Sequence, residues 1–299
     1  MSLGIDLSPS LKQCNFDCLY CELAPAAAVD HQQSIVAPDT VMIDLQAALE
    51  QHPDIEVITV TANGEPTLYP HLDELMQKID VIKGNTKTLI LSNSATLMDE
   101  KVFNTLLRFN QVKLSLDAVS NDIFKKIDRP AHSIEIEDIK KSIIHFSKQY
   151  NGELFIEILF VKGLNDTVDE IAALNSVLHH IDAARIDIGT IDRPPAYPID
   201  GLDYEELHLI ATRFDASLPI HIASRHQTAP STSSYTDSEI INTLDKRPLT
   251  LEDMKLLFDK ETMQRVRNLE TDSKIIQNGR SGVIFYLPAE NMKRKRKKS

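Results

Sequence analysis

The sequence has few cysteines: three in 299 residues, all between positions 14 and 21. An odd number of cysteines argues against a disulfide framework. The N-terminus also lacks a basic region followed by an apolar run, which is the pattern of an export signal. We therefore expect free thiols in a reducing compartment, the cytoplasm. Any thiolate-ligated or redox-active site must lie in this one segment.

The chain also lacks an apolar run long enough to span a membrane, and it lacks an excess of positive charge. A formal net charge of −12 disfavours a broad phosphate-binding surface, because affinity for nucleic acids comes largely from Lys and Arg. The exception is a run of basic residues at positions 293–298. This run fits either a disordered, solvated terminus or an arm that contacts RNA or another anionic surface.

The first 222 residues alternate apolar, β-branched segments with segments of helical periodicity. A hydrophobic content of 42% is enough for one large α/β domain and a small second one. Strands that alternate with helices at this spacing predict a parallel sheet with right-handed crossovers, and hence an open or closed (β/α) barrel. The predicted strands are residues 55–60, 88–91, 112–116, 154–160, 185–189 and 219–222.

Polar side chains recur where the predicted strands end. Barrel folds place their active sites at the carboxyl ends of the strands. Each such residue has an ordinary alternative, since Asn, Ser and Asp are common in turns and helix caps. Their repetition at one rim nevertheless favours a binding site, which comprises Asn63, Glu65, Ser92, Asn93, Ser115, Asp117 and Asn165.

The composition changes after residue 222. Residues 223–237 are rich in Ser and Thr without periodicity, which indicates a linker. Three short helices (238–244, 250–257 and 260–269) and a hairpin (273–277 with 283–286) follow, and this order predicts a winged-helix-like domain at 238–287. Residues 288–299 are predicted to be a basic, disordered tail.

The cysteines have the spacing Cys14-x3-Cys18-x2-Cys21, with Tyr20 just before the last one. Three crowded thiolates repel one another, and a metal centre is the usual way in which such a loop becomes stable. Three Cys can hold three irons of a [4Fe–4S] cluster and leave the fourth iron open. The alternatives are a zinc site, which would need a fourth ligand such as His31, and a metal-free loop.

This motif ahead of a β/α repeat resembles the radical S-adenosylmethionine (SAM) superfamily, and the resemblance covers residues 1–222. It implies a partial (β/α)6 barrel with one [4Fe–4S] cluster on Cys14, Cys18 and Cys21. It also implies that SAM binds the open iron through its amino and carboxylate groups. One electron, from a reductant such as flavodoxin or ferredoxin, would then cleave the sulfonium and form a 5′-deoxyadenosyl radical that abstracts hydrogen from a substrate.

Residues 61–66 resemble the Gly-Gly-Glu-Pro motif of this superfamily, which contacts the methionyl amino group, with Asn63 in place of the first Gly. Glu65 is the candidate that supports the ammonium. The resemblance further implies that Tyr20 lines the cluster and the adenine edge, and that Arg193 with Asn165 contacts the substrate or the adenosyl group. The implied cofactor-binding set is Tyr20, Asn63, Gly64, Glu65, Pro66, Asn93, Ser115, Asp117 and Asn165.

Within the superfamily, the motifs resemble a branch of Fe–S oxidoreductases related to the wyosine-forming tRNA enzymes, which makes a tRNA-modifying enzyme one alternative. A metal- or redox-sensing winged-helix regulator that binds DNA is another, although residues 260–269 are only weakly basic for a recognition helix. We expect a cytoplasmic monomer without a membrane partner. Its substrate, a small molecule or RNA, and its catalytic hydrogen donor or base cannot be named from the residues.

Overall fold

The computed structural model describes residues 1–8, 11–223, 234–246, 248–280 and 283–289. Most of the predicted linker at 223–237 and all of the predicted tail beyond position 289 lie outside the described residues. Within the described ranges, no helix is both long and apolar enough to cross a membrane.

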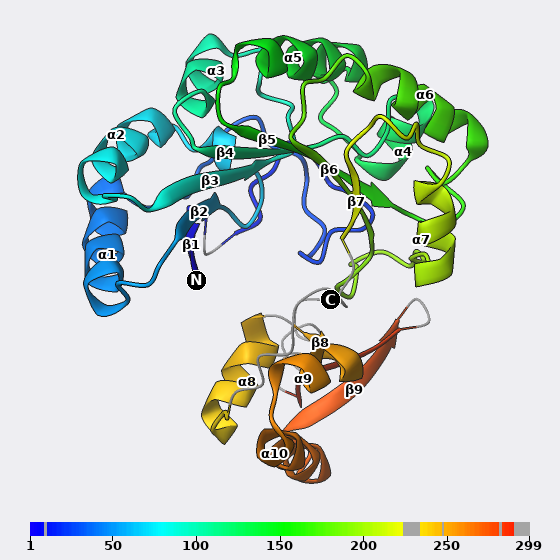
Figure 1. Ribbon diagram of the computed structural model, residues 1–299. Helices are drawn as coiled ribbons and strands as arrows, with labels where there is room; N and C mark the ends of the chain where they lie inside the picture. Colours follow the sequence, from blue (N-terminus) through cyan, green and yellow to red (C-terminus); the bar gives the residue numbers. More distant parts are fainter. Residues whose placement is uncertain (9–10, 224–233, 247, 281–282, 290–299) are drawn as a thin grey trace.

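Residues 1–223 form a curved α/β unit around a parallel sheet (Figure 1). The neighbours in the sheet follow chain order, and each neighbouring pair is parallel. The strands are β1 (Ser2–Asp6), β2 (Val57–Thr61), β3 (Lys87–Ser92), β4 (Gln111–Ser115), β5 (Glu153–Phe160), β6 (Arg185–Thr190) and β7 (Ile220–Ile222). This arrangement confirms the predicted α/β class with a parallel sheet.

The sheet has seven strands, where the sequence predicts six. The additional strand is β1, which pairs with β2 in the register Ser2 to Val57. β1 has five residues, and of these only Leu3 and Ile5 are large and apolar. Its pattern is therefore too short to stand out, and its place is set by the neighbouring strand.

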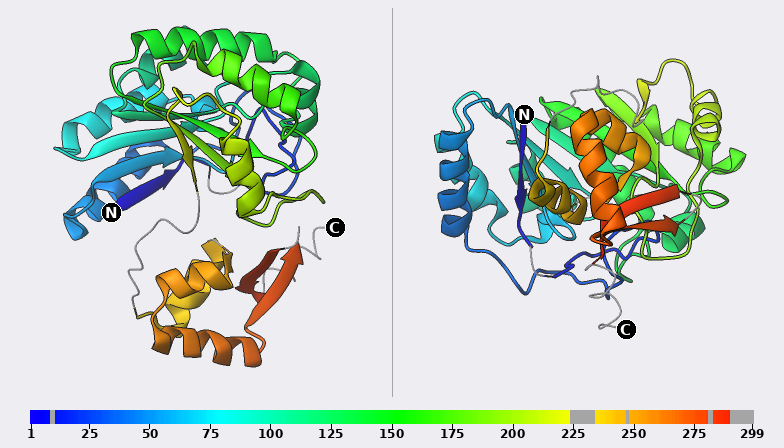
Figure 2. Two further views of the ribbon diagram at one scale, coloured as in Figure 1. Left: turned by 45° about the vertical axis from the view of Figure 1, so that its right-hand side comes forward. Right: turned by 90° about the horizontal axis from the view of Figure 1, so that it is seen from below.

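Helices cover the outer, convex side of this sheet, as Figure 1 and the left view of Figure 2 both show. The short helix α4 is not predicted from the sequence. The helical segments are α1 (Pro38–Gln51), the 3₁₀ turn η1 (Pro66–Leu68), α2 (Leu72–Ile82), α3 (Glu100–Leu106), α4 (Asn121–Ile127), α5 (Ile136–Gln149), α6 (Val168–Leu178) and α7 (Tyr204–Ala211).

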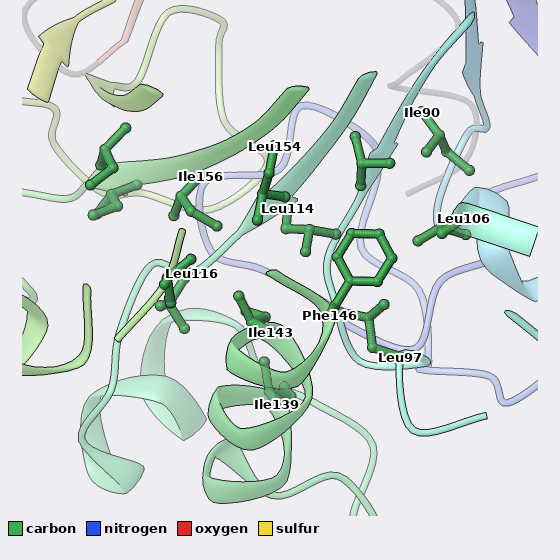
Figure 3. Close-up of a cluster of buried hydrophobic side chains, with 14 of the residues drawn as sticks. Ile90, Leu97, Leu106, Leu114, Leu116, Ile139, Ile143, Phe146, Leu154 and Ile156 are labelled. Carbon is green, nitrogen blue, oxygen red and sulfur yellow. The ribbon is translucent and has the colours of Figure 1, made fainter. Parts of the chain in front are cut away.

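The core lies between the convex face of the sheet and the helices. Figure 3 shows Leu114 of β4 and Ile156 of β5 directed toward Ile143 and Phe146 of α5. All four side chains are fully buried. Because side chains alternate along a strand, every second residue of β4 and β5 enters this core.

The remaining residues of these strands face the concave side, and several are charged. Lys113 Nζ of β4 lies 3.0 Å from Glu157 Oε1 of β5 and 2.9 Å from Asp187 Oδ2 of β6. His221 of β7 continues this row, with Nδ1 3.0 Å from Asp187 Oδ1. A closed barrel of this class fills its interior with branched apolar side chains. Here the concave face also carries charged side chains, and a cavity opens on it.

The C-terminal described residues form a second unit with its own core, which contains Ile240, Met254, Phe258 and Val266. Its three strands are antiparallel in the order β8-β10-β9. The short strand β8 is not predicted from the sequence. The elements are α8 (Asp237–Lys246), β8 (Leu249–Thr250), α9 (Leu251–Leu257), α10 (Lys260–Thr271), β9 (Ile275–Arg280) and β10 (Val283–Pro288).

Candidate functional site

A cavity of about 810 Å³ opens at the carboxyl ends of the strands, on the concave side of the sheet. Its volume lies within the range of small-molecule and cofactor sites. All three cysteines line it, together with residues that follow β2, β3 and β4. Of the strand-end residues that the sequence predicts to meet at one rim, those that line this cavity are Glu65, Ser92, Asn93 and Ser115.

Backbone hydrogen bonds hold the cysteine loop against the segment that joins α4 to α5. Leu19 N donates to Ile127 O at 2.8 Å, and Ala131 N donates to Asn15 O at 2.9 Å. Phe16 forms a bridge with Pro130 between these two bonds. The loop therefore takes its shape from residues more than a hundred positions away, and the three cysteines remain partly exposed and free.

The thiols lie in a setting that suits metal-bound thiolates. Cys14 Sγ accepts hydrogen bonds from Phe16 N at 3.4 Å and from Asn93 Nδ2 at 3.6 Å. Burial raises the pKa of Cys14 to about 12 and that of Cys18 well above its usual range. Burial thus favours the neutral thiols in the absence of metal, whereas bound iron would keep them ionised. The donor set therefore fits a cluster held by three cysteines.

Other metal arrangements find less support in the geometry. Within the described part of the chain, no group of three or more His, Cys, Asp or Glu side chains, the three cysteines included, is placed to hold a single metal ion. His31, the fourth ligand that a zinc site would need, is exposed beside Asp30 and is not among the residues that line the cavity. The cluster assignment rests on the cysteine spacing and the shared cavity.

The turn after β2 docks directly on the start of the cysteine loop. Gln13 N donates to Asn63 O at 2.9 Å, and Glu65 N donates to Gln13 O at 3.0 Å. Between these bonds, Gly64 has a φ of +136°, and a Cβ atom there would lie 2.0 Å from Gln13 O. Only glycine fits this conformation and this approach. The backbone that comes close to Gly64 is thus the protein's own, at Gln13.

Glu65 is buried, with an exposed fraction of 2%, and it organises the turn after β3. Its Oε2 accepts from Asn93 N at 2.7 Å, and its Oε1 accepts from Thr67 Oγ1 at 2.6 Å. Burial raises the pKa of Glu65, while these hydrogen bonds oppose the shift. The carboxyl group lines the cavity and fixes Asn93, which in turn donates to Cys14.

A buried acidic cluster supports the other side of the cysteine loop. The Tyr20 hydroxyl donates to Asp117 Oδ2 and lies 3.5 Å from Asp128 Oδ1. Burial raises the pKa of Asp117 to about 7 and, together with the Asp117 charge, raises that of Asp128 well above its usual range. At neutral pH the two carboxyl groups share protons, because two buried negative charges so close together repel each other.

The structure does not bring every predicted residue to the cavity. Asn165 is fully buried, and its Nδ2 donates to Asp117 O and Leu159 O, both at 2.8 Å, so it braces the end of β5. Pro66 begins η1 and is buried, and Asn63 contributes backbone contacts to Gln13 and Asp6. These three are not among the residues that line the large cavity, nor is Asp117, whereas Tyr20 and Arg193 are.

Sequence reasoning misses several residues that line the cavity. Glu157 and Asp187 interrupt otherwise apolar strands at alternate positions, and this signal could have identified the polar concave face. Lys12 lies two residues before the first cysteine, but a single lysine in a loop carries no signal of burial. Arg193, in contrast, is predicted from the sequence; it lines the cavity and forms an ion pair with Glu22.

Comparisons with known proteins agree with this geometry. Residues 9–174, which include the three cysteines, match the family model of the radical SAM superfamily. The chain is 37% identical over 287 residues to a UPF0026 protein of Helicobacter pylori, covering 95% of this chain and 92% of that protein.

Two solved structures share the fold. A radical SAM methyltransferase from Sphaerobacter thermophilus superposes with a TM-score of 0.58 at 14% identity, covering 73% of this chain and 65% of that one. The FeFe-hydrogenase maturase HydG from Carboxydothermus hydrogenoformans superposes with a TM-score of 0.54 at 13% identity, covering 75% and 54%. With the superfamily match across more than half of its length, this chain belongs to the radical SAM superfamily.

Proposed function

We propose that the cavity holds one [4Fe–4S] cluster and SAM, and that the protein cleaves SAM reductively to act on a further substrate. The observation that carries this proposal is that Cys14, Cys18 and Cys21 line one cavity together with Glu65, Asn93 and Ser115. When bound, the reduced cluster would supply one electron to the sulfonium of SAM, and cleavage of the bond from sulfur to C5′ would give methionine and a 5′-deoxyadenosyl radical able to take a hydrogen atom from the substrate.

The side chains of the chain itself bind and orient these groups. Three thiolates hold three irons, and Asn93 donates to Cys14 Sγ, an interaction that stabilises the ionised sulfur. Because Glu65 and Ser115 line the cavity, we assign the Glu65 carboxyl group the role of accepting from an ammonium group and the Ser115 hydroxyl that of bonding a polar group of the cofactor. Asp117 and Asn165 do not line the cavity, and both fix the end of β5 through hydrogen bonds with the backbone of Leu159.

The cavity walls also limit what reaches the site. Leu91, Leu159 and Ile191 supply apolar surface, while Glu157 and Asp187 supply carboxylates on the concave face. A substrate with polar groups, whether a small molecule or RNA, would contact both the apolar side chains and the carboxylates. The electron would come from a small reductant such as flavodoxin or ferredoxin.

The C-terminal unit is proposed to be a winged-helix domain. Its elements follow the order helix, strand, helix, helix, strand, strand, and the two last strands form a hairpin. On α10, Arg265 is paired with Glu261 at 2.9 Å. The three basic residues of this helix, Lys260, Arg265 and Arg267, are offset by Glu261 and Glu270, so the helix is only weakly basic. We therefore assign the unit a role in contacting the substrate or a protein.

The test is release of 5′-deoxyadenosine. Anaerobically reconstituted protein, given dithionite and SAM, is expected to release 5′-deoxyadenosine, measured by liquid chromatography and mass spectrometry. Cys18→Ser should abolish the release, because the serine hydroxyl is a poor ligand for iron. Ser217→Ala, on an exposed turn, is the control and should match the wild type. Release from Cys18→Ser at the wild-type rate would refute the assignment.

A further inference from the structure

Asp17, between the first two cysteines, is the centre of a buried polar network. Its side chain is 10% exposed. Asp17 Oδ1 accepts from Lys12 Nζ at 2.7 Å and from Ala26 N at 3.4 Å. Its Oδ2 accepts from the Tyr197 hydroxyl and lies 3.6 Å from Arg129 Nη1. One carboxylate thus joins four separate parts of the chain.

Two of these partners come from segments far along the sequence. Tyr197 lies between β6 and α7, and its neighbour Ala196 donates its N–H to Cys21 O at 2.9 Å. Arg193 of the same segment pairs with Glu22. This segment is therefore fastened to the cysteine loop at three points, and it also forms part of the cavity wall through Arg193.

Arg129 shows that the network is strong enough to hold an unfavourable backbone. Its φ is +46°, in the left-handed region that non-glycine residues rarely adopt. Its guanidinium group lies 4.6 Å from the centre of the Tyr197 ring, and its carbonyl accepts from Asp17 N at 3.2 Å. Such conformations persist where the surrounding contacts determine them, often at functional sites.

Lys12 places a positive charge beside the thiols. Its side chain is 7% exposed, and the residue lines the cavity together with Cys14, Cys18 and Cys21. A buried ammonium needs a partner of opposite charge, and Asp17 is that partner. The Lys12–Asp17 pair therefore lies at the edge of the space that the proposed cluster would occupy.

We propose that Asp17 is a positioning residue that fixes the cysteine loop and the Lys12 ammonium, and that this pair tunes the reduction potential of the cluster. This inference rests on the proposed function, since it requires the cluster. A nearby cation stabilises the more negative, reduced cluster, and a nearby anion destabilises it. Loss of each charge should consequently shift the potential in opposite directions.

The experiment compares the midpoint potential of the reconstituted cluster in wild type, Asp17→Asn and Lys12→Met by anaerobic titration monitored by electron paramagnetic resonance. Asp17→Asn should give a less negative potential than wild type, and Lys12→Met a more negative one. Asp182→Asn, which removes an exposed carboxylate paired with Lys148 at 2.7 Å, is the matched control and should leave the potential unchanged.

Tyr197→Phe provides a second variant in case Asp17→Asn does not load iron. It removes only the hydroxyl that donates to Asp17, and it should speed the loss of cluster absorbance in air roughly tenfold, the effect of one hydrogen bond to a charged group.

Potentials that stay at the wild-type value, or that move in the same direction in both variants, would overturn the inference, as would wild-type air stability in Tyr197→Phe. Wild-type protein that takes up no iron would instead refute the proposed function itself.

Discussion

The two faces of the seven-stranded sheet differ in how deeply their side chains are buried, and this difference separates alternate residues of the same strands. On the convex face, Leu114 and Ile156 are fully buried against α5. On the concave face of the same strands, Lys113, Ser115 and Glu157 remain partly exposed, and Ser115 and Glu157 line the cavity. One face therefore provides the free energy of folding, and the other is available for binding and chemistry. Substitutions on the two faces should separate stability from function.

The largest expected effect is on the convex face. Phe146→Ala removes a fully buried ring that stacks on Tyr150 at 4.9 Å between centroids and contacts Phe103 edge to face. It should lower the free energy of unfolding by about 3–5 kcal/mol, measured by urea denaturation of the metal-free protein.

The matched change on the concave face is Leu91→Ala, at a residue that is 36% exposed and lines the cavity. Because Leu91 is partly exposed, its truncation removes less buried apolar surface than that of Phe146, and the free energy of unfolding should fall by less than about 1.5 kcal/mol. If Phe146→Ala and Leu91→Ala lower the free energy of unfolding equally, the convex face does not contribute more to stability than the concave face.

A pH-dependent effect should come from the buried acidic cluster behind the cysteine loop. Burial raises the pKa of Asp117 to about 7, so the folded protein keeps a proton that the unfolded chain releases near its ordinary pKa. The folded state then binds more protons between these two values, and the free energy of unfolding should fall as pH rises from about 4 to about 7, by at most roughly 1.4 kcal/mol per pH unit.

Urea denaturation of the metal-free protein across this pH range measures the dependence. Asp117→Asn should make this dependence shallower and leave the part that comes from burial of Asp128, while Asp182→Asn at the surface should not change it. An unchanged pH dependence in Asp117→Asn would show that Asp117 is ionised in the folded protein.

Much of the candidate site could be predicted because its signals are local. The spacing of Cys14, Cys18 and Cys21 predicts the loop that lines the cavity, and the positions of Glu65, Asn93 and Ser115 at strand ends predict the rim. The periodicity of the strands and helices predicts the parallel sheet. These features depend on residues a few positions apart.

The features that could not be predicted depend on contacts between distant segments. Asn165 resembles a binding residue in sequence, but its amide is taken up by Asp117 O and Leu159 O. Asp17 resembles an ordinary loop residue, yet its carboxylate accepts a hydrogen bond from Tyr197, which lies 180 positions away in the sequence. Strand β1 becomes recognisable only beside β2. Such roles follow from the fold, which the local pattern does not contain.

The central claim is that three cysteines hold a [4Fe–4S] cluster with one iron open to SAM. The most direct test is iron analysis of the anaerobically reconstituted protein, followed by electron paramagnetic resonance of the reduced protein with and without SAM. The account predicts about four irons per chain and a signal that changes when SAM is added. Stoichiometric zinc without a visible chromophore, or an iron signal that SAM leaves unchanged, would contradict it.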